Sequence, residues 1–90
     1  MLKIEQTQNT DERTVLTLSG DVRANDIPEL HRMVLEAWKT SREVHVDCRE
    51  VRLLDREVVR LLATCRGRIR LIHAPVYVRE WLRMERRIGR

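Results

Sequence analysis

Four residues of the types used in acid–base or nucleophilic chemistry lie in or directly after two neighbouring expected strands. They are His45, Asp47, Cys48 and His73. Each also has a structural interpretation, because His45 alternates with valines in a strand, Asp47 is a turn former and His73 lies in a loop before Pro75. No motif connects the four residues, so we predict that the protein is not an enzyme.

The motifs that carry cofactor, hydrolase or metal chemistry are absent from the sequence. The chain has no GxGxxG, no GxxxxGK[ST], no GxSxG and no HExxH. Cys48 and Cys65 are too far apart for a CxxC redox or metal half-site. We therefore expect no cofactor and no metal, with both cysteines acting as small buried or half-buried hydrophobic residues.

Positive charge is concentrated in the last third of the chain. Lys and Arg number 18 against 14 Asp and Glu, a net charge of +4, and from Arg66 onward the sequence reads RGRIRLIHAPVYVREWLRMERRIGR. Such a region attracts an acidic protein, a nucleic acid or an anionic surface, although a solvated helix face has the same composition. Trp38 and Trp81 are expected in buried stripes, which leaves few rings for base stacking and disfavours nucleic-acid binding. A purely electrostatic nucleic-acid binder remains an alternative, through Arg66, Arg68, Arg70, Arg86, Arg87 and Arg90.

The 90 residues are expected to form a single domain spanning 1–90, because no Pro-, Gly- or Ser-rich stretch divides them. A chain of this size buries about 60–70% of its unfolded surface, enough for one sheet and a few helices but not for a deep cavity. The N-terminus lacks a signal-peptide pattern and the apolar runs are short. We expect a cytoplasmic protein without membrane insertion.

The first half of the chain predicts two strands and a helix. Alternating residues from Leu2 and the segment 14–19, TVLTLS, are typical of strands. Asp26-x-x-Glu29 is a capping-box pattern and marks a helix start. The apolar face of this helix is expected to comprise Ile27, Leu30, Val34, Leu35 and Trp38.

The second half continues the alternation of strands and helices. A short strand is expected at 43–47, a helix after Asp55 as N-cap, a strand at 68–72, and a third helix opened by Pro75. The predicted fold class is therefore α/β, in the order ββαβαβα. It has a mixed, mostly parallel sheet of four to five strands, about three helices, and one face better covered than the other.

Partners of such sheets meet the loops beyond the carboxyl ends of the parallel strands. Here these are expected at 47–55, at 73–75 and, nearby, at 20–25. Function is therefore sought in these loops.

The segment from Thr14 to about Met84 resembles the STAS domain, the fold of bacterial anti-sigma-factor antagonists and related regulatory modules. LTLSGDVRANDIPEL is similar to the family's strand, G-E-L-D turn and helix, and VHVDCREVRLLDREVVRLL to its strand, D-S-S-G loop and helix. RIRLIHAPVYVREWL corresponds to the following strand and helix. The resemblance implies a module that binds other proteins in a bacterial regulatory or transport-associated assembly.

The resemblance also implies an altered switch. In the family, the second serine of D-S-S-G is phosphorylated by a partner kinase, and here Glu57 stands at that phosphoacceptor position. Arg23 stands where the family usually has the aspartate of G-E-L-D. A carboxylate imitates only part of a phosphate's charge, and the simpler interpretation is that Glu57 favours the positive end of its helix. We expect that serine phosphorylation has been lost at this loop.

The resemblance places the partner-binding site where two loops meet. The expected contact residues are Asp21, Arg23, Asn25, Asp55, Arg56 and Glu57. Arg23 and Glu57 are expected to form an exposed ion pair. The implied partner is an anti-sigma-factor or kinase-like protein, or alternatively a transporter ATPase subunit on which the domain docks. The match also ends before the last element of some relatives, so dimerisation through an uncovered edge or helix is a further expectation.

Overall fold

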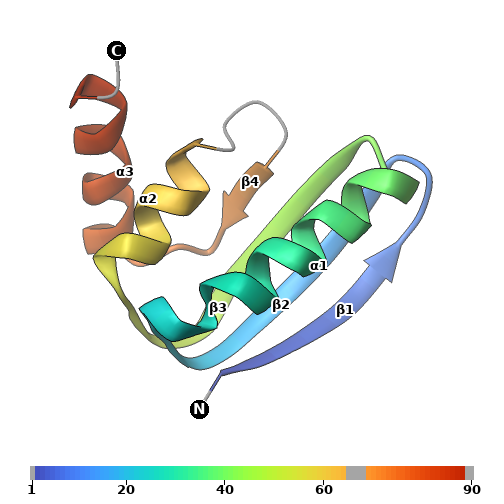
Figure 1. The fold of residues 1–90 in the computed structure, drawn as a ribbon, viewed down its shortest axis with the longest axis horizontal. Helices are drawn as coiled ribbons and strands as arrows, with labels where there is room; N and C mark the ends of the chain where they lie inside the picture. The colour runs from blue at the N-terminus through green and yellow to red at the C-terminus, as the bar shows by residue number, and fades with distance from the viewer. Residues whose placement is uncertain (1, 65–68, 89–90) are drawn as a thin grey trace.

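The computed structural model describes residues 2–64 and 69–88, with side chains described as far as Met84. The described elements follow the order ββαβαβα, with one short 3-10 turn before the first helix (Figure 1). The strands are β1 (Lys3–Asn9), β2 (Arg13–Val22), β3 (Glu43–Leu54) and β4 (Ile69–Ile72). The helices are η1 (Ala24–Asp26), α1 (Ile27–Thr40), α2 (Arg56–Thr64) and α3 (Val76–Ile88).

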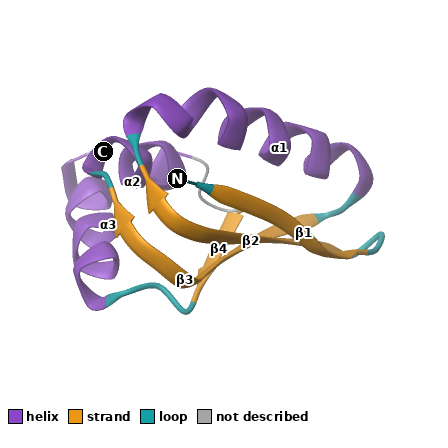
Figure 2. Ribbon diagram, turned by 90° about the horizontal axis from the view of Figure 1, so that it is seen from below, coloured by secondary structure: helices purple, strands orange, loops and turns teal. Residues whose placement is uncertain are grey.

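The sheet is mixed and mostly parallel, which confirms the predicted fold class. Its strand order is β1-β2-β3-β4; β1 runs antiparallel to β2, whereas β2, β3 and β4 are parallel. Figure 2 shows α1 and α2 on one face of the sheet, while no described element covers the opposite face. The uneven covering expected from the strand patterns is therefore present.

The core lies between the sheet and its helices. Successive strand residues point to opposite faces, so Leu16 and Leu18 of β2 share the covered face and are almost completely buried. They belong to one cluster with Leu30 and Val34 of α1 and Val58 of α2. Leu35, which is expected on the same apolar face of the helix, is 43% exposed, since it lies at the margin of that face.

Strand β3 is longer than the sequence pattern predicts. The segment from Asp47 to Leu54 continues the strand, so the expected loop at 47–55 is wrong apart from Asp55. The Asp47 carboxylate accepts a hydrogen bond from the Arg49 backbone N–H at 2.9 Å. This local side-chain to backbone bond is the kind that aspartate makes in turns. The pairing of β3 with β2 nevertheless resumes at Glu50, after a shift in register. Turn chemistry therefore produces an irregularity inside the strand and not its end.

Gly20 lies where β2 changes register with β3. Its φ is +85°, and the pairing shifts between Gly20 and Asp21. A residue with a Cβ resists this conformation, so glycine is the residue that the irregularity requires. The bend directs the end of β2 toward the start of η1.

The start of α1 differs from the expected capping box. The Asp26 carboxylate accepts a hydrogen bond from the backbone N–H of Arg23 at 2.9 Å, and Asp26 makes no side-chain cap to α1. The aspartate therefore closes the turn that precedes the helix. The predicted features at Cys65, Gly67 and Arg68 lie outside the described residues.

Candidate functional site

Two loops 31 residues apart in sequence are joined at the end of the β2–β3 pair. The Asp55 backbone N–H donates to the Val22 carbonyl at 2.9 Å, and the Asp55 Oδ2 accepts from the Ala24 N–H at 3.0 Å. Both bonds extend the parallel pairing of Val22 with Leu54. Asp55 therefore holds the η1 turn against the start of α2.

The same residue also begins α2. The Asp55 carbonyl accepts hydrogen bonds from the N–H groups of Val58 at 3.0 Å and Val59 at 3.2 Å. Asp55 thus occupies the expected N-cap position, and its carboxylate accepts a hydrogen bond across the site from Ala24. Asp55 therefore joins the two halves of the candidate site through both its backbone and its side chain.

Arg23 forms a different ion pair from the expected one. Its guanidinium contacts Asp21 at 3.4 Å, and Asp21 also contacts the Nε of Arg52 at 3.9 Å. The expected pair with Glu57 is therefore wrong, because Arg23 turns back to the strand from which its own loop emerges. The Asp21 side chain is only 24% exposed, whereas Glu57 is exposed.

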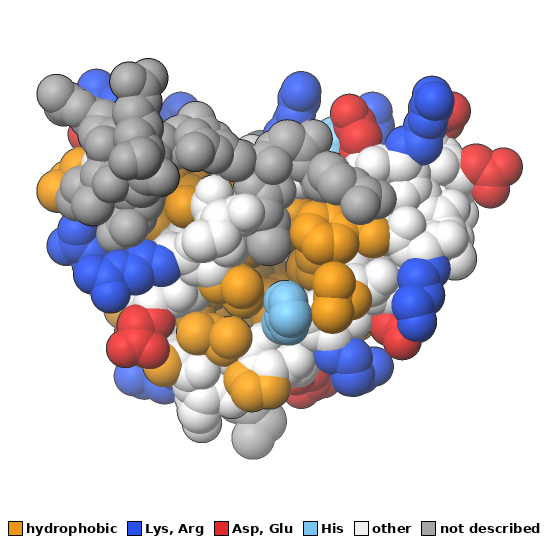
Figure 3. All heavy atoms as spheres, turned by 45° about the horizontal axis from the view of Figure 1, so that its top comes forward, with side chains coloured by type: hydrophobic (Ala, Val, Ile, Leu, Met, Phe, Trp, Pro, Cys, Tyr) orange, Lys and Arg blue, Asp and Glu red, His pale blue; other side chains and the backbone are white. Residues whose placement is uncertain are grey.

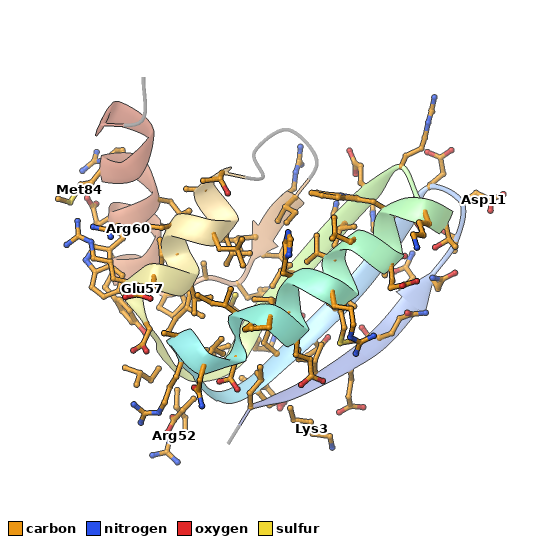
Figure 4. All side chains as sticks on the ribbon, in the orientation of Figure 1. Lys3, Asp11, Arg52, Glu57, Arg60 and Met84 are labelled. Carbon is orange, nitrogen blue, oxygen red and sulfur yellow. The ribbon has the colours of Figure 1, made fainter. Side chains whose placement is uncertain are left out.

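The six expected contact residues form a surface with two half-buried members and four exposed ones. Asp21 and Asp55 are half-buried, whereas the exposed members are Arg23, Asn25, Arg56 and Glu57. The two half-buried aspartates are held in place by the bonds described above. Figure 4 shows Glu57 projecting outward from the first turn of α2. A carboxylate there is favoured by the helix macrodipole by about 0.3–1 kcal/mol.

Two aromatic residues of α3, which are not among the six expected contact residues, support the site. The Leu54 backbone N–H donates to the Tyr77 hydroxyl at 3.2 Å. The Tyr77 and Trp81 rings meet edge to face at 5.2 Å, and the Arg56 guanidinium lies 5.6 Å from the Trp81 ring centroid. In the sequence, the i, i+4 spacing of Tyr77 and Trp81 indicates that the two rings lie on one side of a helix.

The residues considered for acid–base chemistry come together in part. The Nδ1 of His73 lies 3.1 Å from the Asp47 carboxylate, and Arg49 reaches the His73 Nε2 at 2.9 Å. His73 has a φ of +57°, so the end of β4 turns sharply to bring the ring there. Burial alone would raise the Asp47 pKa, but the Arg49 N–H and the His73 ring outweigh it, and this pKa lies below its ordinary value.

The other two residues of that group do not join this pair. The Nε2 of His45 lies 3.1 Å from the Glu43 carboxylate. Cys48 follows Asp47 in β3, so its side chain lies on the opposite face of the sheet, where it is buried in the core. Burial, with a contribution from the Asp47 charge, raises the pKa of its thiol to about 12. The thiolate required of a nucleophile is therefore strongly disfavoured. Within residues 2–64 and 69–84, no cluster of three or more His, Cys, Asp or Glu side chains is arranged to hold a metal ion.

The helix-covered side of the molecule carries both apolar and charged side chains. Figure 3 shows apolar side chains gathered toward the middle of this view, with basic and acidic side chains around them. None of the helices in the described part of the chain has the length and apolar content needed to cross a membrane.

The chain belongs to the STAS domain family. A family model described as "Mlab, STAS domain" matches residues 5–85, nearly the whole chain. The STAS domain is a non-enzymatic interaction fold, commonly a protein-interaction module of anti-sigma antagonists or transporters. A comparison with curated proteins found no match.

Proposed function

We propose that this chain is a protein-interaction module that docks through the surface of Asp21, Arg23, Asn25, Asp55, Arg56 and Glu57 without being switched by serine phosphorylation. The observation that carries the proposal is the bridge from Asp55 to Ala24 and Val22, which makes the two loops one preformed surface. A surface that is already ordered loses little conformational entropy on binding. Binding then needs no modification of the loop, or is regulated through the partner.

The absence of a phosphoacceptor at the start of α2 supports constitutive binding. The loop reads Asp55-Arg56-Glu57-Val58, and none of these side chains accepts a phosphoryl group from a serine kinase. Glu57 supplies one permanent negative charge near the helix N-terminus, where a phosphoserine supplies about 1.5–2 charges. The charge of this loop is therefore not altered by serine phosphorylation.

We further propose that the protein is not an enzyme and acts in the bacterial cytoplasm. Two observations support the first statement: the Cys48 thiol is buried with a raised pKa, and the Asp47 carboxylate is engaged by Arg49 and His73. The partner is an anti-sigma-factor or kinase-like protein, or else a transporter ATPase subunit. The STAS family includes modules of both kinds of assembly.

Affinity capture followed by a binding measurement tests the proposal. Proteins retained by the tagged chain are identified by mass spectrometry, produced recombinantly and titrated against two variants. Asn25→Trp places bulk on the exposed η1 turn without a charge change, and Gln8→Trp places the same bulk on exposed β1 as the control. We expect Asn25→Trp to weaken binding and Gln8→Trp to leave it unchanged. Equal binding by both variants would show that this surface is not the docking site.

A further inference from the structure

Exposed apolar side chains are concentrated near the candidate site. Among the residues whose side chains are described, the large apolar residues that are exposed are Leu35, Leu53, Val76, Tyr77 and Met84. All but Leu35 lie at the end of β3 or on α3. An apolar concentration of this kind, bordered by charged groups, is typical of an interaction surface.

Two side-chain stripes run beside each other on α2 and α3. Tyr77, Trp81 and Met84 have the i, i+4, i+7 spacing that aligns residues on one side of a helix. Arg56 and Arg60 have the i, i+4 spacing on α2, and both are exposed. We call these five residues the α2–α3 face.

A direct contact joins the two stripes into one surface. The Arg56 guanidinium lies over the Trp81 ring, so arginine and aromatic groups form one continuous patch. Figure 4 shows Arg60 and Met84 on the same side of the molecule as Glu57 of the docking surface. The α2–α3 face therefore continues the docking surface along the helices.

The composition of the α2–α3 face is that of binding hot spots. Arg, Tyr, Trp and Met are enriched in protein interfaces, and Trp, Tyr and Arg dominate their binding energy. Glu80 of α3 forms an ion pair with Arg83 on the same helix. The chain after Leu82 reads RMERRIGR, so its charge is also predominantly positive. An acidic partner is the electrostatic complement of such a surface.

We propose that the α2–α3 face binds an acidic amphipathic helix of the partner protein. This inference rests on the proposed function and identifies the chemistry of the partner. The Tyr77–Trp81–Met84 stripe extends over about 10 Å along α3, which is two turns of a partner helix. The partner helix places apolar side chains at i, i+4 and i+7 against this stripe and carboxylates against Arg56 and Arg60.

Nucleic acid and a membrane surface fit the α2–α3 face less well. The Trp81 ring already has Arg56 over it, and the Tyr77 hydroxyl is bonded to the Leu54 N–H, which restricts stacking on bases. Tyr77 and Met84 are 37% and 43% exposed, and that is little apolar area to insert into lipid. These two occupants are tested as alternatives.

The first experiment is a fluorescence-anisotropy titration with a synthetic helical peptide. Its leucines are at i, i+4 and i+7 with glutamates beside them, and a second peptide carries glutamines in place of the glutamates. We expect the glutamate peptide to bind at physiological salt, and to lose about tenfold in affinity to the variant Arg56→Gln/Arg60→Gln, as expected for two weakened ionic contacts. The control Arg13→Gln/Arg42→Gln removes two exposed arginines where β2 and β3 begin, and we expect it to leave binding unchanged.

A second variant tests the apolar part of the α2–α3 face. Met84→Gln keeps the side-chain length at an exposed position, so the fold is retained, and we expect a several-fold loss for the peptide. Duplex DNA and vesicles of phosphatidylcholine with phosphatidylglycerol are titrated in parallel. Equal affinity for the glutamate and glutamine peptides, or tighter binding of the DNA or the vesicles, overturns the inference.

The captured partner separates failure of this inference from failure of the proposed function. If Asn25→Trp weakens binding of the partner and Met84→Gln does not, the docking surface stands and the acidic-helix inference fails. If wild type retains no protein at all, the proposed function fails irrespective of the peptide result. If Asn25→Trp and Met84→Gln both weaken binding of the partner, and the controls Gln8→Trp and Arg13→Gln/Arg42→Gln do not, the two proposals are supported together.

Discussion

Replacement of Asp55 by alanine is the sharpest test of how the docking surface is held together. The substitution removes the hydrogen bond from the Ala24 N–H to Oδ2, which measures 3.0 Å and is partly buried. It also removes a negative charge from the start of α2. A hydrogen bond to a charged group contributes about 1.5–3 kcal/mol and the helix-end charge about 0.3–1 kcal/mol. Because Asp55 is only half-buried, the lower ends of these ranges apply, and the expected loss is about 2 kcal/mol.

Thermal and urea unfolding followed by circular dichroism measure this loss. For a domain of this size, about 2 kcal/mol lowers Tm by about 8–16 °C. Asp55→Asn keeps an acceptor oxygen without the charge and should lose about half as much. The control Asp11→Ala removes an exposed carboxylate from the turn between β1 and β2. If Asp55→Ala were no less stable than Asp11→Ala, the bridge would not hold the loops and the reasoning would be refuted.

Three further changes test other parts of the structure. Gly20→Ala forces a Cβ into a φ of +85° and should destabilise the fold by about 1–2 kcal/mol in urea unfolding, whereas no loss would exclude that backbone conformation. The pKa of Asp47 is lowered, so above pH 3.8 wild type should have a larger free energy of unfolding than Asp47→Asn in urea titrations. This difference should disappear as the pH falls through the lower folded-state pKa. A difference that stayed constant with pH would contradict the contacts of Asp47 with His73 and Arg49. In a Cys65→Ser background, Cys48 should react with a thiol reagent only after unfolding, since its pKa is raised to about 12 and it is buried; fast labelling of the native protein would contradict this.

Local patterns were sufficient to predict most of the fold. The alternation Leu16, Leu18 and the helical spacing of Leu30 and Val34 follow from burial on one face, and the structure buries all four. The length of β3 was not predictable in the same way. Asp47 has the chemistry of a turn former, but pairing with β2 carries the chain onward to Leu54.

The candidate site was predictable in its residues but not in its contacts. The family resemblance placed Asp21, Arg23, Asp55 and Glu57 near one another, and the structure brings their two loops together. The partner of each carboxylate depends on the path of the backbone in the two loops, which no local sequence pattern specifies. Arg23 therefore pairs with Asp21 and not Glu57, and Asp55 reaches Ala24.

The uncovered edge of β1 has a consequence for self-association. A second strand that adds to an edge needs an uninterrupted row of backbone donors and acceptors. In β1 the pairing with β2 shifts between Gln6 and Gln8, so the row is broken near its middle. An added strand could stay in register on one side of this bulge only, either along Lys3–Gln6 or at Gln8 and Asn9. The bulge thus protects a crowded solution of this domain from growing into sheet-like fibres.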